Sequence, residues 1–234
     1  SSNIIDCWRT AYHIAQTIGG DPGYPGLFGV ADVSSFKPKR LIRLDTLGWN
    51  VTERGIQTRF LNFLSKLEKE GVEIVNRTDD PKIETFEQAL QTIPEFQPGL
   101  SAWEIQWPAL LLRDDGREQI SETLVDRFEF GERMALNEYR KMLDALDKLR
   151  EKFTSLEGVA DGFITLSTPT MPPIGKATGD SVFGDPSSCL EAPAWSIPVL
   201  KEEGLPLGVQ LLGNKHQDYT LAQIGKWMME TFLK

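Results

Sequence analysis

The sequence predicts an α/β fold in which a mixed β-sheet is flanked by helices and carries a helical middle segment. Three observations lead to this fold class. A strand–helix–strand pattern occupies 40–75, amphipathic helices follow over 82–156, and strand-like segments return after residue 160. The first pattern requires parallel strands, whereas a short turn joins the last two strands, which must then run antiparallel. The sheet is therefore expected to be mixed.

The first element is a predicted helix over 4–18, because its apolar residues recur at three- and four-residue steps. Asn3 is a suitable N-cap for this helix, and Gly19-Gly20 is a suitable stop. The stretch that follows, DPGYPG at 21–26, predicts a loop rich in turns.

The strand–helix–strand unit comes next. One short strand is predicted over 40–49 and another over 72–75. Between them, the segment 52–71 places large apolar residues on one helical face, with Thr52 as its N-cap and Gly71 at its end. The joints are short, which favours a βαβ unit with a right-handed crossover.

The middle of the chain is predicted to be helical. Its four helical segments are 84–93, 100–113, 117–134 and 137–153. We expect a break at Pro108, and we interpret the apolar faces as packing surfaces. Trp103 and Trp107 could face a substrate, but core packing is the favoured interpretation for both.

Strand character returns in the last third. GFITLS at 162–167 is a nearly continuous apolar run, typical of a strand that is covered on both faces. The segments 193–200 and 205–213 predict two further strands, and the turn KEEG makes them an antiparallel hairpin. A final helix is predicted over 217–233.

Composition excludes several classes of protein. The chain has 234 residues and a net charge of −9 with mixed signs, so a general nucleic-acid or anionic-membrane surface is not expected. No apolar run is long enough to cross a membrane, and the first residues do not resemble a signal peptide. Cys7 and Cys189 are expected to be reduced and buried, which fits the cytoplasm. A start other than Met suggests processing, a cloning boundary or a fragment.

Residues that could hold a metal or a cofactor are sparse. His13 and His216 have no further ligand at suitable spacing, and no phosphate-binding loop is present, so neither a metal nor a cofactor is expected. The segment 184–189 is interpreted as a loop with free backbone donors. The acid pairs Asp79-Asp80 and Asp114-Asp115 lie in polar turns and are expected to be solvated.

Tandem serines are the remaining candidates for nucleophiles. A Ser–Ser–Lys mechanism needs one serine to attack, a second to relay its proton, and glycines that shape an oxyanion hole. Ser1-Ser2, Ser34-Ser35 and Ser187-Ser188 all lack that surround, and turn or capping roles are favoured. No catalytic residue is therefore expected in this chain.

Motifs near the C-terminus point to a family. DGFITLSTPTMPPIG at 161–175 precedes PSSCLEAPAWSIPVLKEEGLPLGVQLLG at 186–213. Together they resemble the C-terminal part of amidase signature enzymes, which carry a Thr-Pro-Thr-x-Pro-like loop, a G-x-P-A-x-S-x-P strand and a G-L-P-x-G-x-Q-x-x-G strand. Ala192 replaces the usual glycine before Pro193. IIDCWRTAYHIA at 4–15 is similar to the helix that follows the family's catalytic region.

The resemblance implies an architecture for the whole chain. It would be the C-terminal part of a single amidase domain. Within it, 1–80 would be a helix and the βαβ unit, 81–156 a helical insertion, and 157–234 the core strands and the last helix.

The resemblance also implies a function. These enzymes hydrolyse carboxamides through an acyl-enzyme, using a Ser–cis-Ser–Lys triad that has no counterpart in 1–234. The chain would then supply sheet and pocket wall to a missing N-terminal catalytic half, with Thr168, Thr170, Met171 and Pro172 as substrate-binding residues. The alternative is that these residues only end a strand and satisfy local backbone, and it stays open.

Two other hypotheses compete with a hydrolase that acts on a small-molecule amide. The chain could be a non-catalytic amidase-like partner or binding subunit, or an unrelated α/β ligand-binding domain. The resemblance leaves the substrate open among small amides, fatty amides, aminoacyl-tRNA intermediates and urea derivatives. Without its other half, the segment should expose sheet edge and apolar faces, so we expect homo-oligomers or poor solubility.

Overall fold

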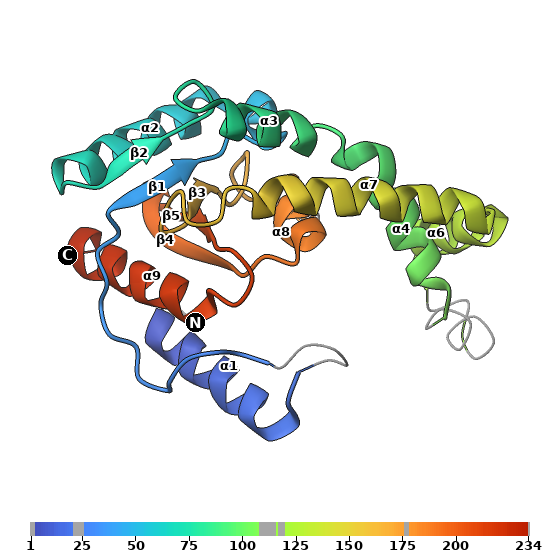
Figure 1. Cartoon of the computed structure of the whole chain (residues 1–234), viewed down its shortest axis with the longest axis horizontal. Coiled ribbons are helices and arrows are strands. Elements are labelled where there is room, and N and C mark those ends of the chain that lie inside the picture. The colour runs from blue at the N-terminus through green and yellow to red at the C-terminus, as the bar shows by residue number, and fades with distance from the viewer. Residues whose placement is uncertain (1–2, 21–25, 108–115, 117–119, 176–177, 234) are drawn as a thin grey trace.

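The computed structural model describes residues 3–20, 26–107, 116, 120–175 and 178–233. The strands of these residues form one five-stranded sheet of order β2-β1-β3-β5-β4 (Figure 1). β1 (Arg40–Arg43) pairs in parallel with β2 (Glu73–Val75) and with β3 (Phe163–Leu166). β5 (Leu205–Leu212) runs antiparallel to both β3 and β4 (Ala194–Glu202). The predicted mixed sheet, the βαβ strand pairing and the hairpin are confirmed.

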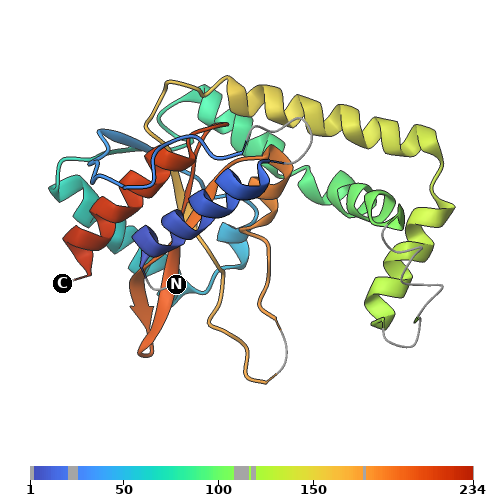
Figure 2. The same cartoon turned by 90° about the horizontal axis from the view of Figure 1, so that it is seen from below.

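Two helices cover one face of the sheet. α2 (Arg54–Lys69) and α9 (Asp218–Phe232) bury apolar side chains against it, and α1 (Ile4–Ile18) packs on α9 from outside (Figure 2). Asn3 caps α1 as predicted, since its Oδ1 accepts from the Ile5 amide at 2.9 Å. Gly19 ends α1 at φ 74°, in the left-handed region that glycine tolerates.

The opposite face is covered by α3 (Pro81–Leu90), α7 (Leu136–Thr154) and the short α8 (Asp185–Leu190). α7 extends beyond the sheet, where α4 (Ile93–Glu104) and α6 (Glu122–Arg133) pack with it as a projecting helical arm (Figures 1 and 2). The predicted helical middle is confirmed, although α4 begins seven residues earlier than the pattern indicated. Pro108 and the Asp114-Asp115 pair lie outside the described residues.

The first strand is shorter than predicted. Instead of reaching residue 49, β1 ends at Arg43, because the backbone turns at Thr46 with φ 54° and then forms a 3-10 helix over Gly48–Val51. Thr52 is not the N-cap of α2, so that prediction is wrong. Its hydroxyl donates to the Gly48 carbonyl at 2.6 Å and closes the 3-10 turn, while α2 begins at Arg54 without a side-chain cap.

The segment 184–189 is helical rather than a loop. Pro186 lies in the first turn of α8, where a missing N–H costs nothing and a fixed φ favours the helix. Both cysteines are free, as expected, and Cys189 is buried, but Cys7 is only half-buried. The expected loop at 21–26 falls almost wholly outside the described residues.

The pairing of β3 with β5 tests one of the alternatives. Phe163 is opposite Leu212 and Leu166 is opposite Val209, so the two motif segments are neighbours in one sheet. An unrelated α/β domain was expected to place them in different sheets. In the parts of the chain that the structure describes, no helix is long and apolar enough to cross a membrane.

Close packing of α9 on β4 gives a first testable prediction. A Cβ at Gly225 would lie 2.8 Å from Ile197 Cδ1 and would also meet Ile4 Cδ1. Gly225→Ala is therefore expected to lower the free energy of unfolding by about 1–3 kcal/mol through overpacking. Gly55→Ala is the matched control, because its nearest neighbour is 3.9 Å away and alanine is the better helix former. Equal stability of the two variants in urea denaturation would contradict this packing.

Candidate functional site

The carboxyl ends of the parallel strands bring two loops together. β1, β2 and β3 all end at the same edge of the sheet, which is where α/β proteins commonly bind ligands. The segment 44–53 follows β1, and the segment 167–172, here called the Thr-Pro loop, follows β3. The backbone N–H of Glu53 donates to the carbonyl of Pro169 at 3.1 Å, so the two loops are in direct contact.

The Thr-Pro loop contains all the predicted site residues. Thr168 Oγ1 donates to the Thr170 carbonyl at 3.0 Å, and Thr170 Oγ1 donates to the Met171 carbonyl at 3.2 Å. Met171 is half-buried against the core of α2 and α9, whereas Pro172 is exposed. Both hydroxyls thus shape the loop with their protons and keep oxygen lone pairs that can accept a hydrogen bond.

Polar residues cross the sheet at the base of this loop. Ser167 Oγ and Ser196 Oγ are 2.8 Å apart, and they meet above Gly208, where any Cβ would collide with both hydroxyls. Gln210 lies opposite Thr165 on β3 and Ser196 on β4. The Gln210 Oε1 is buried and has no hydrogen-bond partner among the described residues.

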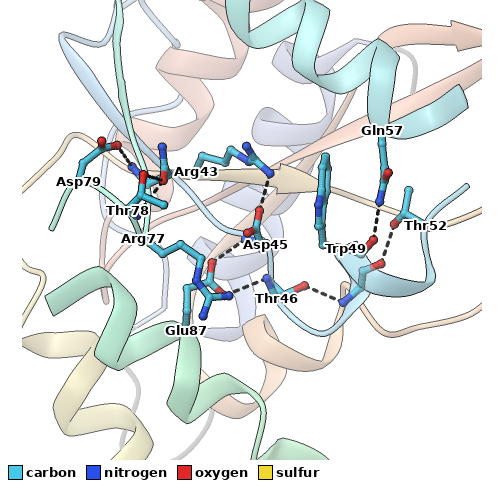
Figure 3. Close-up of polar contacts among 12 residues, drawn as sticks. Arg43, Asp45, Thr46, Trp49, Thr52, Gln57, Arg77, Thr78, Asp79 and Glu87 are labelled. Carbon is cyan, nitrogen blue, oxygen red and sulfur yellow. Dashed lines mark hydrogen bonds and ion pairs between the residues drawn. The ribbon is translucent and has the colours of Figure 1, made fainter. Parts of the chain in front are cut away.

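A buried carboxylate supports the other loop (Figure 3). Glu87 of α3 is fully buried, and its two oxygens accept from the backbone N–H groups of Asp45 at 2.6 Å and Thr46 at 3.0 Å. The Thr46 hydroxyl in turn accepts from the Gly48 N–H at 3.1 Å. With the bond from Thr52 to Gly48, these contacts fix the segment that touches the Thr-Pro loop.

Charged and aromatic side chains line the same segment. Arg43 Nη2 pairs with Asp45 Oδ1 at 2.6 Å, and the guanidinium lies 4.5 Å from the ring centroid of Trp49, a cation–π contact. The Arg43 Nε is buried without a hydrogen-bond partner among the described residues. Gln57 Nε2 donates to the Trp49 carbonyl at 2.7 Å, which ties α2 to the loop.

The pKa values follow the burial of these groups. Burial raises the pKa of Glu87 to about 7, with the Asp45 carboxylate acting in the same direction and the two backbone N–H donors acting against it. Arg77 pairs with Glu84 one turn away, and this contact lowers the pKa of Glu84. Glu87 therefore titrates near neutral pH at the end of β1.

The other sequence candidates have structural roles. Ser187 and Ser188 both donate their hydroxyls to the Gly184 carbonyl, and Ser34 accepts from Gln223. Ser1 and Ser2 lie outside the described residues. Burial raises the pKa of Cys189 to about 11, so its thiol stays protonated at neutral pH.

The acid pair and the histidines also make local contacts. Asp80 caps α3 through the Lys82 N–H at 2.7 Å, and Asp79 accepts from the Asn76 N–H at 2.9 Å. His216 packs on Phe28 with ring centroids 4.7 Å apart. Within the described ranges, no cluster of three or more His, Cys, Asp or Glu side chains could hold a metal ion.

The two middle tryptophans differ from each other. Trp103 stacks on Tyr139 with ring centroids 4.9 Å apart, in keeping with packing. Trp107 is 79% exposed, so the expectation of core packing is wrong for this residue.

Sequence reasoning missed Arg43, Asp45 and Glu87. One signal could have found Glu87: it lies in the helical stripe of Ile83, Phe86 and Leu90, all fully buried. A carboxylate within such a stripe must find hydrogen-bond donors. Arg43 and Asp45 carry no comparable signal, because their pairing depends on where β1 ends.

The fold and the arrangement of its loops are those of amidase signature enzymes. No family model matches the sequence. A crystal structure described as an amidase superposes with a TM-score of 0.74 and 16% identity, over 96% of this chain and 51% of that one. A bacterial aryl acylamidase of the amidase signature family gives 0.58 and 13%, over 85% and 44%. The resemblance predicted from the motifs is confirmed at the level of fold.

A curated relative adds sequence similarity. The chain is 35% identical over 79 residues to a glutamyl-tRNA(Gln) amidotransferase subunit of Archaeoglobus fulgidus, which is 29% of this chain and 17% of that protein. The crystal structure of the same type of subunit from Thermotoga maritima gives a TM-score of 0.56 and 18% identity, over 84% of this chain and 43% of that one. The chain spans about half the length of these solved structures, and its match covers a smaller share of the curated relative.

Proposed function

We propose that this chain is the C-terminal part of an amidase-type hydrolase that cleaves the C–N bond of a carboxamide through an acyl-enzyme. In this proposal the chain supplies sheet and one wall of the substrate pocket, and a Ser–cis-Ser–Lys triad comes from polypeptide outside residues 1–234. The observation that carries the proposal is the Thr-Pro loop at the carboxyl end of β3, bonded to the segment that follows β1.

The geometry of the loop supports a role in holding the substrate. The Thr168 and Thr170 hydroxyls have donated their protons within the loop, so their oxygens can accept the N–H of a carboxamide. The half-buried Met171 would give an apolar contact, and Pro172 would restrict the backbone beside it. None of these groups attacks the carbonyl. Their contribution would be to orient it.

The proposed partners follow from this division of labour. They are a small-molecule amide, the catalytic half and, if the sheet edges at β2 and β4 stay uncovered, further copies of this chain. A cytoplasmic location and the single amidase domain expected from the sequence belong to the same proposal. Two of the similar proteins are described as a subunit or as part of a complex, which supports an assembled enzyme.

The decisive experiment begins with the DNA upstream of the Ser1 codon. We expect a reading frame with a Lys and a Gly-rich tandem-serine motif. Its product, joined to or mixed with this chain, should release ammonia or amine from a panel of carboxamides, and a fluorophosphonate probe should label the upstream serine. Hydrolysis by residues 1–234 alone, or an upstream frame without the motif, would overturn the proposal.

Substitution in the Thr-Pro loop tests the pocket wall. Thr168→Val and Thr170→Val in the assembled enzyme are each expected to lower kcat/KM by about 3–10-fold, the loss of one hydrogen bond to the substrate. Thr58→Val is the matched control, since its hydroxyl also bonds a local carbonyl, that of Arg54, but on the exposed surface of α2. Wild-type kcat/KM in both loop variants would remove these residues from the site.

A second function fits one observation. Among the described residues, the tandem-serine hydroxyls are engaged in local hydrogen bonds, as a non-catalytic binding subunit would allow. That function predicts a stable complex with a partner and no hydrolysis by any assembly that contains this chain. Mass measurement of the native species separates the two, because a covalent product about twice as long excludes a separate subunit.

A further inference from the structure

The buried Glu87 lies at one end of a hydrogen-bond path whose other end is the Thr-Pro loop (Figure 3). We propose that Glu87 is a positioning residue: its carboxylate fixes the turn at Asp45 and Thr46, and that turn holds the Thr-Pro loop in place through segment 44–53. The relevance of this path to catalysis rests on the proposed pocket wall. The coupling itself does not.

The first step of the path is a two-point clamp. The N–H groups of Asp45 and Thr46 point at the Glu87 carboxylate, at 2.6 and 3.0 Å, where β1 has ended and its ladder no longer accepts them. Thr46 holds a left-handed backbone, φ 54°, which is strained for a β-branched residue. Two hydrogen bonds to one anion can hold that conformation, and an apolar residue at 87 would leave two buried donors unsatisfied.

The second step carries the turn to the loop. Thr46 Oγ1 accepts from Gly48 N–H, and Gly48 accepts from Thr52 Oγ1, so the 3-10 turn is closed from both sides. The next residue, Glu53, donates its N–H to the Pro169 carbonyl at 3.1 Å. Displacement of the turn at 46 would therefore move the donor that holds the loop.

Space around the turn is limited, which favours transmission over local relaxation. A Cβ at Gly48 would lie 2.5 Å from the ring of Phe183, a fully buried residue. The ring and the backbone of the 3-10 turn are already in close contact. A shift at Asp45 and Thr46 is then passed along the segment because the turn cannot move toward Phe183.

The charges that face Glu87 make the clamp sensitive to pH. They are the Asp45 carboxylate at the end of β1 and the Arg77 guanidinium after β2, the latter bonded to Glu84 of α3. The pKa of Glu87 is about 7 when buried, against the ordinary 4.5 when open to water. Opening of the turn is therefore easier at high pH, where the buried carboxylate is ionised and opening rehydrates it.

The experiment measures both ends of the path without substrate. One readout is amide exchange of Asp45 and Thr46 followed by NMR between pH 5.5 and 8, corrected for intrinsic exchange. The other is the ε-methyl resonance of Met171 in a methionine-labelled protein, which reports on the Thr-Pro loop. In the wild type, protection at Asp45 and Thr46 is expected to fall about 30-fold over this range, and the Met171 signal should shift with it.

Two variants interrupt the path at different points. Glu87→Gln removes the titrating group and one of the two acceptors, so it should abolish the pH dependence and shift the Met171 signal. Glu53→Pro removes only the N–H that holds Pro169, at a position with φ −57° that proline can adopt, after the extended Thr52. It should shift the Met171 signal while the pH-dependent protection at Asp45 and Thr46 stays.

The controls are Glu84→Gln, the same chemical change on α3 away from the turn, and Glu53→Ala, which keeps the N–H. Both should leave the Met171 signal at its wild-type position. A Met171 signal that ignores Glu87→Gln, or protection that keeps its pH dependence in that variant, would overturn the inference. Failure of the assembled enzyme to hydrolyse amides would contradict the proposed function and leave this result unaffected.

Discussion

Replacement of Trp8 by alanine is expected to lower the free energy of unfolding by about 3–5 kcal/mol, the range for a fully buried large aromatic residue. Trp8 is completely buried, and its ring packs with Tyr12, Trp195 and Tyr219 at centroid distances of 6.3, 6.4 and 5.5 Å. Its Nε1 donates to the Val30 carbonyl at 2.8 Å. The substitution therefore removes the contact that joins α1 to α9 and to β4.

Urea denaturation followed by circular dichroism measures this loss. Trp107→Ala is the matched control, because Trp107 is 79% exposed and its removal should change the free energy of unfolding by less than about 0.5 kcal/mol. If the two tryptophan variants lose the same stability, the placement of α1 on α9 is wrong.

The second large effect is a change of stability with pH that depends on Glu87. Its folded pKa of about 7 lies above the ordinary 4.5, so the folded state prefers the protonated carboxyl. This contribution to stability is complete below pH 4.5 and is lost as pH rises through 7. Between pH 5 and 8 the wild type should lose about 2–3 kcal/mol of unfolding free energy relative to Glu87→Gln.

Denaturation at a series of pH values for both proteins tests this sign and size. Glu84→Gln serves as the control, since Glu84 is an α3 carboxylate whose pKa is lowered by Arg77 and not raised. A wild type that becomes more stable than Glu87→Gln with rising pH would mean that the hydrogen bonds to the carboxylate outweigh its burial.

Most of the fold could be predicted because it depends on local patterns. The helical periodicity of 137–153 and the apolar run at 162–167 each have one compatible element, and both are found as α7 and β3. The elements that were missed depend on contacts distant in sequence. β1 ends early because Glu87, 42 residues away, binds the N–H of Asp45, and no local pattern contains that contact.

The site was predictable only in part for the same reason. The Thr-Pro loop was visible as a change of composition at the end of a strand, and its residues do lie together. The segment that contacts it was not, because the bond from Glu53 to Pro169 joins two backbones and leaves no mark on side-chain identity. Whether Thr168, Thr170, Met171 and Pro172 touch a substrate stays a prediction.

The position of β1 in the sheet has a consequence during synthesis on the ribosome. Arg40 N–H donates to Asp161, which lies 121 positions further along the chain, and β3 follows immediately after. At about 5–20 residues per second, β1 and its neighbour β2 would wait roughly 6–24 s for the strand that completes them. During that interval Leu41 and Ile42, both fully buried in the finished protein, remain on an open strand edge of the nascent chain. The arm of α4, α6 and α7 is made within this interval from contacts between neighbouring helices, so it can fold before the sheet closes.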